Sequence, residues 1–124
     1  MPVKITASES LIMDVLWRAD RSLAIEDVRE GLTDETWTDA TIRTFLSRLV
    51  RKKAVAAAKD SRRFLYRPLI ARSDYVHAES KSLIDRLFDG QIEPFVAHFS
   101  ERQDLSAEEI ARLRQLIERL GRGK

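Results

Sequence analysis

The stretch from Trp37 to Arg51 constrains the fold more than any other part of the chain. Thr38 is a favourable N-cap residue, and Trp37 and Ile42 have the spacing of a hydrophobic staple across a helix start. Apolar residues then recur with the spacing of a single helix face: Ile42, Phe45, Leu46, Leu49 and Val50. The stretch therefore predicts an amphipathic helix that packs one face against a core.

The opposite face of this predicted helix is polar and basic. At about 100° per residue, the side chains opposite Ile42 and their flanking neighbours are Ala40, Arg43, Thr44, Ser47, Arg48 and Arg51. No acidic residue follows Asp39 within the stretch, although an ordinary solvated helix face mixes Glu with Lys. The pattern favours a surface that approaches phosphates and base edges; the alternative is a solubilising surface.

The positive charge of the chain is concentrated in its middle third. The formal net charge is only +2, but residues 38–72 carry 10 basic and 2 acidic side chains. Residues 1–37 carry 4 basic and 8 acidic side chains, and residues 73–124 carry 8 and 10. This segregation indicates a polyanion-binding segment between two acidic ones.

The elements around the basic helix predict a winged helix-turn-helix. A capping box formed by Thr6 and Glu9 begins a helix that runs to about Arg18, and Ser22 is expected to cap a second helix over about 23–32. Strands are expected at 55–59 and 63–68, connected by residues 60–62. Three helices followed by a β-hairpin, the wing, give a mainly α DNA-binding domain over residues 1–72.

The remaining residues, 73–124, predict a helical dimerisation arm. Helices are expected from Asp74 to Phe88, over 91–99, and from a second capping box, Ser106 with Glu109, to about Leu120. Such short helices bury little by themselves, so their apolar faces are expected to meet a second copy; the alternative is packing on the N-terminal helices of the same chain. The residues assigned to dimerisation are Leu83, Leu87, Phe88, Phe95, Ile110, Leu113, Ile117 and Leu120.

Several classes of protein are not expected. The chain has no Cys, and its two histidines, His77 and His98, have no partners at metal-ligand spacing, so no metal or other cofactor is predicted. No nucleophile elbow or Gly-rich phosphate loop is present, which argues against an enzyme. The longest apolar run, 54–58, is far shorter than a membrane span, and no signal peptide is recognisable. We therefore expect no membrane insertion and a cytoplasmic location.

Particular residues along nearly the whole chain resemble the penicillinase-repressor (BlaI/MecI/CopY) family of bacterial transcriptional regulators. The resemblance rests on Thr6, Glu9, Met13, Leu16, Trp17, Glu26, Val28, Trp37, the run Thr41-Ile42-Arg43-Thr44-Phe45-Leu46, Arg48, Leu49, Lys52, Lys53, Tyr66 and Pro68. Downstream it continues through Tyr75, Leu83, Ile84, Leu87, Phe88, Gly90 and the run Phe95-Val96-Ala97-His98-Phe99.

The resemblance implies a homodimeric repressor that binds inverted-repeat operator DNA through a recognition helix over 39–53 and the wing. Thr41, Arg43 and Thr44 fall in the family's reading motif. The full set of expected DNA contacts is Thr38, Thr41, Arg43, Thr44, Ser47, Arg48, Arg51, Lys52, Lys53, Arg62 and Arg63. Phosphate contacts from Lys and Arg would supply affinity, and base-edge contacts from Thr, Arg and Ser would supply specificity.

The sequence departs from the family pattern at two positions, one at the end of the recognition helix and one in the arm. The family usually has Gly where this chain has Ala54, so either the helix exit differs or a left-handed Ala is accepted with strain. Relatives linked to β-lactam sensing are cleaved in the arm, and the resemblance makes a membrane metalloprotease sensor a candidate partner. The matching position, near Ala97-His98-Phe99, has His98 where those relatives have Asn.

A different class of function remains open from the sequence. The basic third could engage an acidic protein, which would make the chain an antitoxin-like or other protein–protein interaction dimer without sequence-specific DNA binding. Binding to its own promoter DNA in a salt series would separate this alternative from a repressor.

Overall fold

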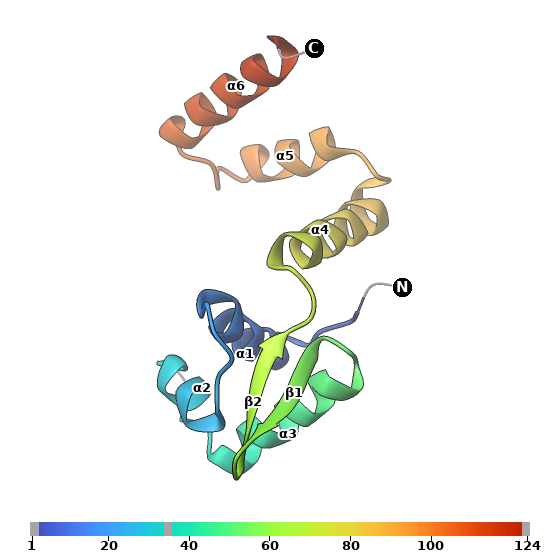
Figure 1. Cartoon of the computed structure of the whole chain (residues 1–124). Helices are drawn as coiled ribbons and strands as arrows, with labels where there is room; N and C mark the ends of the chain where they lie inside the picture. The colour runs from blue at the N-terminus through green and yellow to red at the C-terminus, as the bar shows by residue number, and fades with distance from the viewer. Residues whose placement is uncertain (1–2, 34–35, 123–124) are drawn as a thin grey trace. The chain divides into compact units, whose positions relative to one another are not determined.

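The computed structural model describes residues 3–33 and 36–122, and in these residues three helices precede a β-hairpin and three more follow it (Figure 1). The described elements are α1 (Ala7–Arg18), α2 (Ile25–Gly31), α3 (Asp39–Arg51), β1 (Val55–Asp60), β2 (Arg63–Pro68), α4 (Arg72–Phe88), α5 (Ile92–Glu101) and α6 (Ala107–Arg122). The predicted fold class, a mainly α winged helix-turn-helix with a helical C-terminal part, is confirmed.

The chain forms two compact units, Met1–Ala78 and Glu79–Lys124. The boundary expected from the sequence, at residue 72, coincides with the start of α4, whereas the compact units divide within that helix. The first turn of α4 belongs to the first unit. There the Tyr75 ring lies 5.5 Å from that of Trp17, whose indole Nε1 donates a 2.9 Å hydrogen bond to the Ile70 carbonyl.

Helix α1 begins with the capping box that its sequence predicts. The Glu9 amide donates to the Thr6 hydroxyl at 3.1 Å, and the Thr6 amide donates to the Glu9 carboxylate at 2.9 Å. Two of the amides that a helix start leaves unpaired are thereby satisfied. One face of the helix then enters the core of the first unit through Ile12, Met13 and Leu16, all fully buried.

The prediction for the second helix is wrong at its start. α2 begins at Ile25, and Ser22 does not cap it; the Ala24 amide is instead satisfied by the Asp27 carboxylate at 3.0 Å. The physical reason is that Leu23 exchanges two backbone hydrogen bonds with Tyr66 of β2, at 2.9 and 2.7 Å, which holds Leu23 in an extended conformation. Sequence spacing within the helix carries no sign of this pairing with a distant strand.

Helix α3 confirms the predicted stripe and N-cap. Thr38 caps the helix by accepting the Thr41 amide at 3.2 Å, and Ile42, Leu46 and Leu49 are fully buried. The helix ends at Arg51, two residues before the predicted end. Trp37 packs on Phe45, with 5.0 Å between the ring centroids.

The exit from α3 is a Schellman motif that places the left-handed residue at Lys53. Lys53 has φ +67°, its amide donates to the Val50 carbonyl at 3.0 Å, and the Ala54 amide donates to the Leu49 carbonyl at 2.9 Å. Ala54 does not have a positive φ, so it carries no such strain. Instead, its methyl group is fully buried in the core.

The hairpin is antiparallel, with Val55 opposite Pro68 and Asp60 opposite Arg63. β1 extends one residue beyond its predicted end, so the connection is the two-residue turn Ser61–Arg62 rather than 60–62, and Ser61 has φ +59°. The run Ala56–Ala58 forms a strand despite the low β propensity of Ala, because β2 supplies its pairing partners.

The second unit contains the predicted C-terminal helices. α4 ends before Gly90, which has φ +77° and whose amide donates to the Ile84 carbonyl at 3.0 Å. The Ser106 hydroxyl caps α6 by accepting the Glu109 amide at 3.0 Å, as its spacing predicts. Between them, α5 carries Phe95, whose ring makes an edge contact of 5.5 Å with Phe88.

Candidate nucleic-acid interface

The outward face of α3 presents the polar and basic side chains that the sequence assigned to DNA binding. The buried residues of this helix face the core, so its opposite side is exposed along most of its length. The exposed members of the predicted set on this face are Arg43, Thr44, Ser47, Arg48 and Arg51. The structure therefore brings these candidates together on a single convex surface, which is the form that enters a major groove.

Three threonines at the N-terminal end of this face form hydrogen bonds within the helix start. The Thr38 hydroxyl accepts the Thr41 amide and also donates to the Thr41 hydroxyl at 3.1 Å. One turn later, the Thr44 hydroxyl donates to the Ala40 carbonyl at 3.0 Å. These bonds fix the hydroxyl groups of both Thr41 and Thr44 before any ligand arrives, which lowers the ordering cost of binding.

The single carboxylate of α3 is neutralised by a neighbouring helix. Asp39, at the start of α3, accepts a hydrogen bond and ion pair from Arg29 of α2. The hydrogen bond to Asp39 raises the pKa of Arg29 above its ordinary value. Arg29 thus masks a negative charge next to the basic face, a role that helical spacing could not reveal because the two residues lie in different helices.

Arg48 is positioned by aromatic packing. Its guanidinium lies 5.7 Å from the centroid of the Phe45 ring, which in turn packs on Trp37. A cation over an aromatic face is attracted by the ring quadrupole. The contact restrains an otherwise long and flexible side chain at the edge of the exposed face.

Lys52 differs from the other basic candidates because the protein itself holds its ammonium group. Nζ lies 2.5 Å from a Glu9 carboxylate oxygen and 2.9 Å from the Lys4 carbonyl. Glu9 is only 1% exposed. Burial raises the pKa of Glu9, but the hydrogen bonds from Lys52 and Thr6 and the Lys52 charge outweigh it and hold the pKa below its ordinary value.

The sequence therefore indicated one of the two roles of Glu9 and missed the other. The capping-box spacing identifies its bond to Thr6, whereas its ion pair with Lys52 joins residues 43 positions apart. Lys53, the next residue, is exposed, and its ammonium group forms no ion pair with the residues that the structure describes. The two lysines, alike in sequence, stand in different environments.

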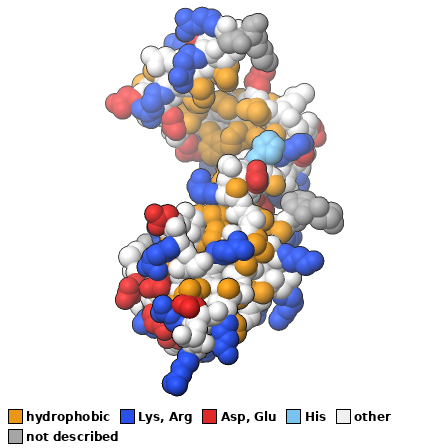
Figure 2. All heavy atoms as spheres, in the orientation of Figure 1, with side chains coloured by type: hydrophobic (Ala, Val, Ile, Leu, Met, Phe, Trp, Pro, Cys, Tyr) orange, Lys and Arg blue, Asp and Glu red, His pale blue; other side chains and the backbone are white. Residues whose placement is uncertain are grey.

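The turn of the hairpin adds a second basic region. Arg62 and Arg63 are exposed at the turn between β1 and β2. In Figure 2, Lys and Arg side chains project at the bottom of the view, where Figure 1 places this turn. The predicted wing contacts are thus available to solvent at the end of the hairpin.

Two hollows lie between the hairpin and α3, and Arg43 and Phe64 line both of them. One hollow, of about 270 Å³, also includes Arg62 and Arg63; the other, of about 350 Å³, also includes Ser47. Phe64 is not among the predicted site residues. The alternation of β2 marks it only as a strand residue, and its exposure follows from how far the hairpin extends beyond the core.

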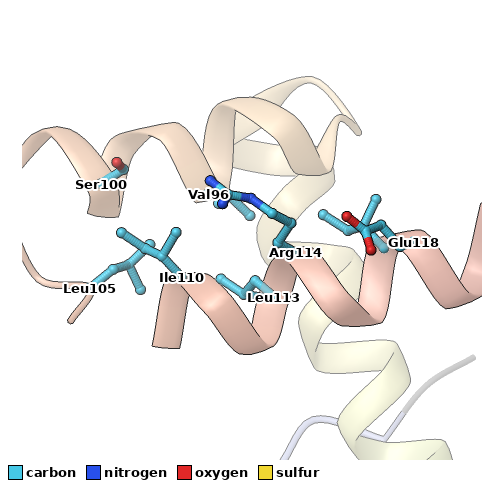
Figure 3. A pocket seen from close by; sticks show the side chains of 8 residues that line it. Val96, Ser100, Leu105, Ile110, Leu113, Arg114 and Glu118 are labelled. Atoms are coloured by element: carbon cyan, nitrogen blue, oxygen red, sulfur yellow. The ribbon is translucent and has the colours of Figure 1, made fainter. Parts of the chain in front are cut away.

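The second unit carries the residues predicted for dimerisation. Leu83, Phe88, Phe95 and Leu113 are partly buried within the unit, whereas Leu87, Ile110, Ile117 and Leu120 are exposed. Figure 2 shows hydrophobic side chains gathered over the helices of this unit. A hollow of about 310 Å³ lies between α5 and α6, with Val96 and Ser100 on one side and Leu105, Ile110 and Leu113 on the other (Figure 3).

Neither a metal centre nor a membrane span is found in the described part of the chain. Within residues 3–33 and 36–122, no three His, Cys, Asp or Glu side chains are grouped so as to hold a metal ion. Over the same residues, no helix is both long and apolar enough to cross a membrane.

Comparison with known protein families gives a match over residues 5–119 to the family described as Penicillinase repressor. The penicillinase repressor of Bacillus licheniformis is 36% identical over 115 residues, which are 93% of this chain and 90% of that protein. The methicillin resistance regulatory protein MecI of Staphylococcus aureus (strain N315) is 31% identical over 114 residues, which are 92% and 93% of the two chains.

Solved structures agree with the fold of the first unit. The solution structure of the DNA-binding domain of the repressor BlaI is 36% identical and has a TM-score of 0.52, covering 60% of this chain and 94% of that one. MepR, a transcription regulator of a Staphylococcus aureus multidrug efflux pump, is similar in fold, with a TM-score of 0.51 at 22% identity. The match covers 98% of this chain and 82% of MepR.

Proposed function

The chain belongs to the penicillinase-repressor family and is a DNA-binding repressor rather than an enzyme, and we propose that it acts as a homodimer on operator DNA with inverted-repeat symmetry. In this proposal α3 is the recognition helix, which lies in the major groove, and the hairpin is the wing. The repressed promoter would be released when the dimer leaves its operator.

The observation that carries the proposal is the exposed, uniformly polar and basic face of α3 beside the basic turn of the hairpin. The carboxylate of Asp39 is masked by Arg29, so this face presents an almost unopposed positive charge. Lys and Arg side chains that neutralise phosphates release condensed counterions, which supplies affinity independent of sequence. We assign phosphate contacts to Arg48, Arg51, Lys53, Arg62 and Arg63. Thr38 is left out because its hydroxyl proton is donated to the Thr41 hydroxyl.

Sequence discrimination is assigned to the centre of the same face. Arg43 has the reach to donate two hydrogen bonds to guanine O6 and N7, and the methyl groups of Thr41 and Thr44 suit a thymine methyl group. The Thr41 hydroxyl can also donate to a base acceptor, because in its bond with Thr38 it is the acceptor. Ser47 lies one turn further along the exposed face. We leave Lys52 out of this set because its ammonium group is bonded to Glu9 and Lys4.

Support for the homodimer comes from α6. Its apolar residues Ile110, Leu113, Ile117 and Leu120 follow the 3–4–3 spacing of a helix–helix seam, and Ile117 and Leu120 are 65% and 61% exposed in the single chain. A second copy with the same seam would cover them. Two recognition helices related by a two-fold axis would then read half-sites about one helical turn apart.

Two further elements of the proposal rest on the family alone. We propose a cytoplasmic location, as for other repressors that act on bacterial promoters. A membrane metalloprotease sensor remains a candidate partner. Cleavage of the 97–99 segment, which contains His98, is the property that would test this partnership.

The deciding experiment is selection of DNA sites by the full chain, followed by mobility-shift titrations on the selected site and on random DNA over a salt series. We expect a pseudo-palindromic site and a steep loss of affinity with salt, about 0.9 log units per log unit of salt for each phosphate neutralised. The absence of a selected site, together with a flat salt response, would favour the protein–protein interaction alternative.

The variants Arg43→Ala and Thr44→Ala test the assignment of the reading residues. Each should lower the ratio of operator to random-DNA affinity, roughly tenfold for Arg43 because a bidentate base contact is worth about 1–3 kcal/mol. If the affinity for both DNAs fell equally, the residue would be a phosphate contact and the assignment would be wrong.

A further inference from the structure

Phe64 has an exposed aromatic ring, although exposing a large apolar side chain to water is unfavourable. It alternates along β2 with Leu65 and lies on the same side of the strand as Tyr66, which is 7% exposed and packs in the core. Two residues nearer the turn, the hairpin has left the core, and Phe64 is 51% exposed. Among the described residues of the first unit, no other large apolar side chain is as exposed.

The surroundings of Phe64 are those of the proposed DNA surface. The ring lines both hollows between α3 and the hairpin, and so does Arg43. One hollow also includes Arg62 and Arg63, together with the carboxylates of Glu26 and Asp39, and the other includes Ser47. The Asp39 carboxylate is paired with Arg29. Phe64 is therefore an apolar group set between the residues proposed to read bases and those proposed to bind phosphates.

DNA offers two kinds of apolar surface to such a ring. The C5-methyl group of thymine projects into the major groove, where Phe is among the side chains that contact it. The C–H surface of a deoxyribose is the second kind. Covering either one removes apolar area from water on both partners, which is favourable by roughly 25 cal/mol per Å² buried.

We propose that Phe64 contacts the DNA through its ring, covering a thymine methyl group or a deoxyribose next to the base read by Arg43. This inference depends on the proposed operator binding by α3 and the hairpin. It assigns to the wing an apolar contact in addition to the charge contacts expected from Arg62 and Arg63.

The test compares Phe64→Ala and Phe64→Leu with Leu69→Ala on the site selected by the wild-type chain. Leu69 is 48% exposed and follows the other end of β2, so its substitution removes a similar apolar area away from the proposed surface. We expect Phe64→Ala to weaken binding roughly five- to tenfold, the equivalent of covering about half of a Phe side chain. Phe64→Leu should recover most of the loss, and Leu69→Ala should bind like the wild type.

Two further measurements identify the contact and separate it from a phosphate contact. The slope of log affinity against log salt should be unchanged in Phe64→Ala, because no counterion is released by an apolar group. Replacing each thymine of the site in turn by deoxyuridine removes a single methyl group. If one replacement weakens the wild type but not Phe64→Ala, the contact is to that methyl group; if none does and Phe64→Ala still binds weakly, the contact is to deoxyribose.

If Phe64→Ala bound the selected site as tightly as the wild type, the inference would be overturned and the proposed function would remain intact. Failure of the wild-type chain to select any site would overturn the proposed function, and the Phe64 contact with it. Thermal unfolding of each variant checks that a loss of binding is not a loss of fold; Phe64→Leu provides the comparison if Phe64→Ala is unstable.

Discussion

Lys52 and Lys53 are adjacent in the sequence and differ in what surrounds their charges. The Lys52 ammonium group is bonded to the buried Glu9 carboxylate and the Lys4 carbonyl, whereas Lys53 is exposed. Lys52 thereby joins the end of α3 to the start of α1. From this contact we predict that Lys52 holds α3 in position and does not bind a phosphate.

The matched variants Lys52→Gln and Lys53→Gln should therefore differ in a mobility-shift salt series. Lys53→Gln should reduce the magnitude of the salt slope by about 0.9, the amount expected when one phosphate is no longer neutralised. Lys52→Gln should weaken binding without changing the slope, and Lys52→Arg should restore part of the affinity. A slope reduced equally by both substitutions would show that Lys52 also binds a phosphate.

The same ion pair predicts how the stability of the protein responds to acid. The pKa of Glu9 is lower in the folded chain than its ordinary value, so the carboxylate contributes stability that is fully present above about pH 4.5. This contribution is lost as the pH falls through the lowered pKa. Glu9→Gln should therefore unfold with a free energy roughly 1–3 kcal/mol lower at pH 7 and with a weaker dependence on pH below 4.5.

The carboxylate of Asp27 provides a control for that measurement. The pKa of Asp27 is lowered chiefly by its hydrogen bond from the Ala24 amide, and also by Arg21. Glu9→Gln should thus retain the part of the acid dependence that Asp27 supplies, and Asp27→Asn should remove that part instead. Chemical denaturation at a series of pH values from acidic to neutral measures both, and identical pH profiles for wild type and Glu9→Gln would contradict the role of Glu9.

At the scale of elements, the end of α3 is held by a backbone conformation that its sequence does not favour. Lys53 occupies the left-handed position of the Schellman motif, which costs an L-residue about 1–2 kcal/mol relative to a right-handed conformation. Ala54, at the next position, has its methyl group in the core. The two positions are therefore expected to respond to glycine in opposite directions.

Lys53→Gly should raise the free energy of unfolding by about 0.5–1 kcal/mol, because Gly accepts a positive φ without strain but also gains freedom in the unfolded chain. Ala54→Gly should lower it by about 1–2 kcal/mol, because it removes a buried methyl group and adds backbone freedom. Urea titrations of the two variants measure whether each substitution raises or lowers the free energy of unfolding. Stabilisation by Ala54→Gly would mean that the left-handed residue is at 54.

Periodicity predicts the bodies of the elements because burial of a stripe is a local property of the helix or strand. The stripe from Ile42 to Leu49 and the caps at Thr6, Thr38 and Ser106 are therefore as their spacing indicates. Element ends depend on partners that are distant in sequence. The start of α2 is set by the pairing of Leu23 with Tyr66, and no spacing within 23–32 carries that information.

The same division applies to the candidate site. The exposed side of α3 follows from the position of its buried stripe, so the placement of Arg43, Ser47 and Arg51 could be predicted. The masking of Asp39, the engagement of Lys52 and the exposure of Phe64 each depend on a second element packed against the first. The sequence places Lys52 in the expected DNA-binding set, although its ammonium group is bonded to Glu9 and Lys4 within the protein.

At the scale of the whole molecule, the proposed function requires the second unit to pair two copies of the chain. Leu113 lines the hollow between α5 and α6 and is partly buried, so its substitution would also disturb packing within the unit. Ile117 belongs to the same predicted seam and also lines this hollow, but it is 65% exposed, which makes it the better position for testing association. A charge there costs the single chain little but would be buried against a second copy.

Ile117→Arg should sediment as a monomer at concentrations where the wild type is a dimer. Because a monomer engages one half-site, its affinity for the full operator should fall by orders of magnitude, while its affinity for an isolated half-site stays unchanged. Gln115→Arg adds the same charge on a different side of the exposed α6 and should leave both properties as in the wild type. A dimer that survives Ile117→Arg would place the interface elsewhere in the second unit. If monomers bound the full operator as tightly as the wild type, operator binding would not require dimerisation.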